Sequence, residues 1–251
     1  MILHEHPFNE RIPTWLRLER LFNRFAQLQA RTDAIDHHFS LVTLFEILDV
    51  ASRPDLKSEV MRDLERQKQQ LNSYKGNPAI AEAALDRTLE DLHTCFSQLA
   101  QMEGKIGHVL TENDWLTAIR SRISIPGGTC EFDLPAYHAW QHLSHQNRQN
   151  DLQRWINHLL PLGDGIKLLL MLLRSTGQPQ KMTAQNGQFQ QNLPQSRTFQ
   201  LLRLYINPET AVIPEISANR LIVTIRMMQQ DEEEHLVPMA KHTDFQLTLC
   251  A

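Results

Sequence analysis

Cysteine is scarce in this sequence, and the few cysteines lack the spacing that disulfide frameworks and zinc sites need. Only three occur among 251 residues, and Cys95, Cys130 and Cys250 form no C-x-x-C pair. An odd number of widely separated cysteines is typical of proteins from a reducing compartment. We therefore expect a cytoplasmic protein whose thiols are free and buried.

Long hydrophobic runs are also missing. The most apolar stretch, residues 166–173, is far shorter than the roughly 20 residues that a helix needs to cross a bilayer. The first residues, MILHEHPFNE, contain neither a basic segment nor a long apolar one, so we expect no signal peptide. These absences predict no membrane-spanning segment and no membrane partner.

The common nucleotide-binding, hydrolase and zinc-protease signatures are absent as well. His138 and His142 lie four residues apart, a spacing that lets two imidazoles share one helix face. His145 could lie above His138, but no carboxylate or third ligand completes the set. Nothing near Cys130 marks its thiol as reactive. We expect no metal, no cofactor and no enzymatic activity, and a metal-dependent enzyme built on the histidine pair is the weakest alternative.

Neither sign of charge dominates the composition. The formal net charge is −4, and 22% of the residues are charged while 41% are hydrophobic. These proportions are typical of a globular protein with an ordinary core. A net negative charge argues against a surface devoted to nucleic acid, so any site for anions should be local.

The most informative stretch is RSRISIPGGTCEFDLPAYHAW, residues 120–140. Ile123 and Ile125 alternate with polar residues, which predicts a strand. The segment 126–128, Pro-Gly-Gly, supplies the residues that a type II turn prefers, so residues up to Phe132 are expected to return as a second strand. Pro135 then marks the first turn of a helix. The stretch therefore predicts a hairpin followed directly by a helix.

The period of the hydrophobic pattern divides the rest of the chain. Spacings of three and four predict a helical domain over residues 14–119 and 135–176. Alternating spacing predicts a β domain over residues 1–13, 120–134 and 177–251. We expect the α+β class, with a helical lobe packed against an antiparallel β lobe. A single sheet would form from the N-terminus, the central hairpin and the C-terminal strands.

Several elements within these domains can be placed more closely. Strands are predicted at 199–206, 220–228 and 245–249, and Asn186–Gly187 predicts a tight turn. The helix that contains residues 166–173 is apolar on nearly every side. It should be a core helix or, alternatively, present one face to an identical partner.

Positively charged side chains gather in three places. One group recurs at spacings of three, four and seven along one side of the first predicted helix: Arg17, Arg20, Arg24 and Arg31. The other two are pairs, each expected on one face of a strand: Arg120 with Arg122, and Arg220 with Arg226. A solvated helix face explains the first group adequately. If the three groups converge, they would instead form a groove for an acidic peptide or a phosphate.

Four stretches of the sequence resemble the ZapD family of bacterial division-ring accessory proteins: EHPFNE, TWLRLE, the LDV after the second predicted helix, and RSRISIPGGTCEFDLPAYHAW. The similarity runs from about His6 to the C-terminal strand. It implies a cytoplasmic, non-enzymatic protein at the mid-cell division site, with a helical and a β lobe. It also implies a homodimer that binds the C-terminal tail of the tubulin-like GTPase FtsZ and bundles its filaments.

The resemblance also implies contact residues. Arg17, His138 and Arg226 stand at motif positions where the family uses positive charge, whereas Trp115 replaces an arginine of the relatives. The predicted partner-binding set joins these positions to the arginine groups: Arg17, Arg24, Arg120, Arg122, His138, Arg220 and Arg226. A nucleic-acid-binding regulator using the same arginines is the alternative, although the aliphatic strand faces offer no surface for base stacking.

Overall fold

A computed structural model describes all residues of the chain, 1–251, which form two compact units. The helical unit is Trp15–Leu169, and the β unit joins Met1–Thr14 to Leu170–Ala251. The α+β class is therefore confirmed. No single helix is long and apolar enough to cross a membrane, and only the bent pair His145–Ile156 and Leu160–Ser175, at 70° to each other, meets that test jointly.

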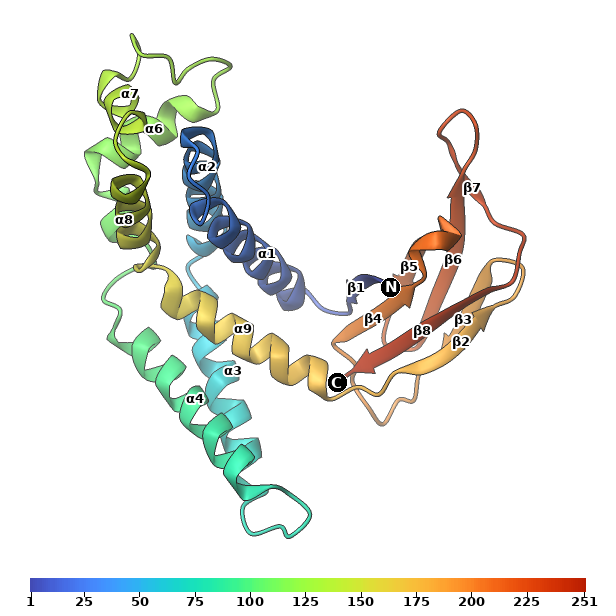
Figure 1. Cartoon of the computed structure of the whole chain (residues 1–251). Coiled ribbons are helices and arrows are strands. Elements are labelled where there is room, and N and C mark those ends of the chain that lie inside the picture. The colour runs from blue at the N-terminus through green and yellow to red at the C-terminus, as the bar shows by residue number, and fades with distance from the viewer. The chain divides into compact units, whose positions relative to one another are not determined.

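All the regular structure between residues 11 and 175 is helical (Figure 1). In order they are α1 (Arg11–Gln29), α2 (Ala34–Ala51), α3 (Leu56–Asn72), α4 (Glu82–Gln101), α5 (His108–Thr111), α6 (Asp114–Ile123), α7 (Pro135–Gln141), α8 (His145–Ile156) and α9 (Leu160–Ser175). Short polar side chains start several of them, as helix N-termini require. The Asp33 carboxylate accepts a hydrogen bond from the backbone N–H of Ile35 at 2.9 Å, and the Asn113 side chain accepts one from Leu116 at 3.0 Å.

The long helices pack through the apolar stripes that the sequence predicted. Figure 1 shows α3 and α4 side by side and antiparallel, with leucines such as Leu64 and Leu92 fully buried. Two glycines let α9 approach its neighbours. A Cβ at Gly163 would lie 3.0 Å from the Phe22 ring of α1, and one at Gly165 would lie 3.3 Å from Leu99 of α4. The prediction that residues 166–173 belong to a core helix is confirmed, since most of them are buried.

A buried arginine ties the start of α2 to α8. Arg148 Nε donates to His37 Nδ1 at 2.9 Å, while its terminal nitrogens donate to the carbonyls of Thr32 at 2.8 Å and Gln141 at 3.0 Å, and to that of Leu143. The other ring nitrogen of His37 lies 2.8 Å from the Arg31 carbonyl. An imidazole that accepts from an arginine on one side and donates to a carbonyl on the other must be neutral.

This arrangement makes stability depend on pH. Burial lowers the pKa of His37, and the charge of Arg148 lowers it further, against the opposing hydrogen bond to the Arg31 carbonyl and the charge of Asp36. Below about pH 6.5 the unfolded chain therefore takes up a proton that the folded state refuses. We expect the free energy of unfolding to be highest above that pH and to fall as pH drops through it.

Histidine NMR titration checks the source of that pH dependence. The His37 imidazole should stay neutral at pH 6, with its proton on Nε2. A His37 titration midpoint at or above 6.5 would contradict the assignment.

The β unit contains two antiparallel sheets. Its strands are β1 (Ile2–Pro7), β2 (Gln180–Ala184), β3 (Gln188–Asn192), β4 (Leu201–Ile206), β5 (Ile213–Ala218), β6 (Ile222–Gln230), β7 (Leu236–Pro238) and β8 (Thr243–Cys250). One sheet has the order β1-β4-β8-β2, and the other has the order β3-β6-β5 with β7 also paired to β6. The buried faces share one core of aliphatic residues and Phe245. β1 joins the C-terminal strands as predicted, but the prediction of a single sheet is wrong.

The central hairpin predicted at 120–134 is also wrong. Residues 120–123 complete α6, and no strand follows before α7. The predicted turn does form: the Gly128 N–H donates to the Ile125 carbonyl at 2.9 Å, and Gly127 has φ +69°. The flanking residues do not pair, and Phe132 is 79% exposed. Cys130, expected to be buried, is only partly so, whereas Cys95 and Cys250 are buried and all three thiols are free.

Candidate partner-binding surface

Of the arginines on α1, one forms an ion pair and two do not. Arg24 pairs with Glu46 of α2, and its Nε donates to Thr43 Oγ1 at 3.0 Å. Arg17 and Arg20 are exposed, and neither has a carboxylate within ion-pair distance. Because the three lie at spacings of three and four, they share one side of α1. The free pair is therefore available to a partner, while Arg24 is already neutralised.

The end of α6 places its two arginines differently from the prediction. Arg120 pairs with Asp49 of α2, one turn from the carboxylate that holds Arg24. Arg122 lies 3.7 Å from Asp133, at the end of the loop before α7. The prediction that they share a strand face is wrong, since residues two apart on a helix point in different directions.

His138 lies on the exposed side of α7. Its ring centroid is 4.5 Å from that of His142, and His142 Nδ1 lies 2.9 Å from the His138 carbonyl, in position to donate to it. Both rings are exposed. Across the chain, no group of three or more His, Cys, Asp or Glu side chains is arranged to hold a metal ion. The pair can offer imidazole hydrogen-bond donors and acceptors to a partner.

The remaining two candidates belong to the β unit. Arg226 projects from the exposed face of β6 and pairs with Glu215 of the neighbouring strand β5 at 2.7 Å. Arg220 lies in the turn between these strands and is exposed. The prediction that the two share one face of a strand is therefore wrong, because the strand begins only at Ile222.

Two acidic residues of α2 were missed by the sequence reasoning. Glu46 and Asp49 bring Arg24 of α1 and Arg120 of α6 to adjacent turns of one helix. Their spacing of three on one helix face was the available signal. They decide which cations are free, because a paired arginine must lose its carboxylate before it can bind an anion.

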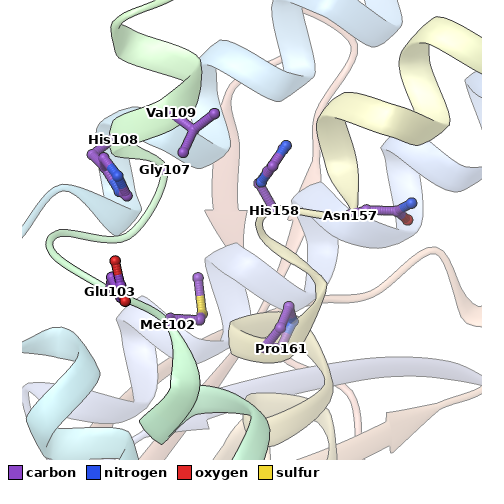
Figure 2. A pocket seen from close by; sticks show the side chains of 8 residues that line it. All are labelled: Met102, Glu103, Gly107, His108, Val109, Asn157, His158 and Pro161. Carbon is purple, nitrogen blue, oxygen red and sulfur yellow. The ribbon is translucent and has the colours of Figure 1, made fainter.

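A separate hollow of about 240 Å³ lies beside the junction of α8 and α9, lined by Met102, Glu103, Gly107, His108, Val109, Asn157, His158 and Pro161. Figure 2 shows His108 and His158 reaching it from two different segments. No third ligand joins them, so they lack the donor set that zinc requires. None of the predicted partner-binding residues lines this hollow.

The sequence was compared with models of known protein families. A family model described as ZapD, a cell division protein, matches residues 16–226. The match extends from the first turns of α1 to β6. All seven predicted partner-binding residues fall within it.

Proposed function

The chain belongs to the ZapD family of cell division proteins, and on this premise we propose that it binds the acidic C-terminal tail of FtsZ and cross-links FtsZ filaments. Two copies of one tail-binding site on a homodimer would join two filaments, and many weak contacts along each filament would make the bundle stable. The protein would act at the mid-cell division site to promote assembly of the division ring.

The observation that carries this proposal is the free cation pair on α1. Arg17 and Arg20 are exposed on one helix face without a carboxylate partner, in a chain whose net charge is −4. Arginine binds carboxylates in a planar, bidentate geometry that suits an acidic peptide. The proposal also includes the other predicted cationic positions as contacts: Arg24, Arg120, Arg122, His138, Arg220 and Arg226.

Sedimentation of the protein with assembled FtsZ filaments tests the proposal. Arg17→Ala should weaken tail binding about two- to fivefold, the loss expected for one exposed ion pair. Bundling should fall further, because each cross-link needs two occupied sites. Arg87→Ala removes an equal charge from an exposed position on α4 and should leave both measurements unchanged.

Deleting the FtsZ tail is the stricter experiment. Filaments that lack the tail should still assemble yet no longer sediment as bundles with this protein. Raising the salt to 1 M shortens the Debye length from about 8 Å to about 3 Å and should also disperse the bundles. Bundling that survives both tail deletion and Arg17→Ala would place the contact on another surface. A parallel shift assay with nucleic acid should show no binding, and tight binding would favour the regulator alternative.

A further inference from the structure

A second hollow, of about 220 Å³, is lined by α1, the last turn of α8 and the first turns of α9. Its apolar wall contains the side chains of Phe22, Phe25, Ala26, Ile156 and Leu160. Gly163 also lines it and has no side chain to fill it. A typical small-molecule pocket measures roughly 300–1,000 Å³, so this hollow has room for one side chain rather than for a cofactor.

Charged groups stand at the rim of the hollow. Glu19 of α1 and Asp164 of α9 supply two carboxylates, and Lys167 supplies one ammonium. Asp164 has no cationic partner within ion-pair distance. Burial raises the pKa of its carboxyl, and the charge of Lys167 only partly offsets this. Burial raises the pKa of the Cys95 thiol on α4, and the charge of Asp164 raises it further.

We propose that this hollow binds a lysine or arginine side chain presented by a partner protein, with the aliphatic stem against Phe22 and Leu160 and the cationic head at Asp164. The apolar wall matches the stem, which snorkelling residues bury readily. The carboxylate matches the head, because Asp164 is exposed at the rim beside an apolar wall and has no cation within ion-pair distance.

The hollow is distinct from the arginine row on the same helix. Residues along α1 turn by about 100° each, so Glu19, Phe22 and Ala26 share a side that is well removed from Arg17 and Arg20. The arginine row favours an acidic partner and the hollow a basic one. The binding of basic side chains is therefore independent of the proposed contact with FtsZ.

NMR titration of the full-length protein tests this inference with a capped Ala-Ala-Lys-Ala-Ala peptide. Amide signals of Phe22, Gly163 and Asp164 should shift together as the peptide binds. A norleucine peptide, which keeps the stem but lacks the charge, should bind about tenfold more weakly, since a charge-assisted contact is lost. An arginine peptide should behave like the lysine peptide. Binding should weaken as pH falls and Asp164 takes up a proton.

Two variants distinguish the contribution of the carboxylate to binding from that of the apolar hollow. Asp164→Asn should reduce lysine-peptide affinity about tenfold while leaving the melting temperature unchanged, because the carboxylate is exposed and forms no ion pair. Ala26→Leu should block the hollow and abolish the shifts without breaking α1, since leucine is a good helix former. Glu90→Gln, at an exposed position on α4, is the matched control and should bind as the unmodified protein does.

Three outcomes would overturn the inference. The first is equal binding of the lysine and norleucine peptides, which would show that the carboxylate contributes nothing. The second is undiminished binding by Asp164→Asn or Ala26→Leu. The third is binding of free spermidine at the same residues more tightly than the peptide, which would identify a small polyamine rather than a protein side chain as the occupant.

Discussion

Replacing Arg148 with alanine should lower the free energy of unfolding of the helical unit by about 3–5 kcal/mol, the loss expected when one partner of a buried charged network is removed. The side chain is only 6% exposed. Its guanidinium donates to His37 and to the carbonyls of Thr32, Gln141 and Leu143. Alanine would leave these acceptors buried and unpaired, at a cost of about 1–3 kcal/mol for each that water cannot reach.

Tryptophan fluorescence measures this loss selectively. All four tryptophans, Trp15, Trp115, Trp140 and Trp155, lie in the helical unit. The last three form a cluster with centroids 5.1–6.1 Å apart. Denaturant unfolding followed by their emission therefore reports on the part of the chain that Arg148 stabilises.

Two further variants separate hydrogen bonding from packing. Arg148→Met keeps most of the volume but cannot donate, so it should be destabilised nearly as much as Arg148→Ala. Arg154→Ala, on the same helix, removes an exposed arginine that pairs with Asp151 at 2.8 Å and should change stability by less than about 1 kcal/mol. Full stability of Arg148→Met would contradict the hydrogen-bond explanation.

Replacing Gly187 with alanine should destabilise the β unit by about 3 kcal/mol or more. Gly187 follows β2 in the turn to β3 and has φ +73°, a conformation that costs an L-residue about 1–2 kcal/mol. A Cβ there would also lie 1.8 Å from the Met239 carbonyl oxygen. Main-chain atoms on both sides leave little room to relax, so overpacking adds about 1–3 kcal/mol.

Gly76 provides a matched control that isolates the free-energy cost of placing alanine at a positive φ. It has nearly the same φ, +79°, but a Cβ there would meet nothing within 4 Å. Gly76→Ala should therefore cost only about 1–2 kcal/mol. The β unit contains no tryptophan. The effect of Gly187→Ala is therefore measured by amide hydrogen exchange in β6 and β8. Equal losses from the two substitutions would show that the approach to Met239 does not matter.

The failure of the predicted hairpin has a definite physical cause. The alternating pattern that predicted a strand rests on only two residues, Ile123 and Ile125. The hydrophobic residues before them follow a helical spacing. Leu116, Ile119 and Ile123 fall three and four residues apart, and the first two are buried in α6. The Pro-Gly turn formed where expected because its geometry is set by local φ preferences. Strand pairing on either side needed partners that the turn alone does not supply.

Local spacing predicted where some of the arginines lie on their helix, but not which of them form ion pairs. The spacing of Arg17, Arg20 and Arg24 correctly predicted one helix side, because neighbours at three and four are fixed by helix geometry. Arg31 was predicted to continue this row, but α1 ends at Gln29 and Arg31 pairs with Asp36 at 3.0 Å instead. The pairing of Arg24 with Glu46 joins residues 22 positions apart. No local pattern indicates such a contact, so the sequence could not distinguish a free cation from a neutralised one.

By itself, the sequence determined the features that depend on near neighbours. These are the α+β class, the hydrophobic periodicity of the helices and strands, and the Asn186–Gly187 turn with both residues at positive φ. They also include the family motifs around TWLR and FDLP. Only the tertiary structure decided the separation of the strands into two sheets, the buried bonds of Arg148 to His37, and the hollow left open beside Gly163. Those features bring together side chains from distant segments, and their positions follow from packing rather than from local conformational preference.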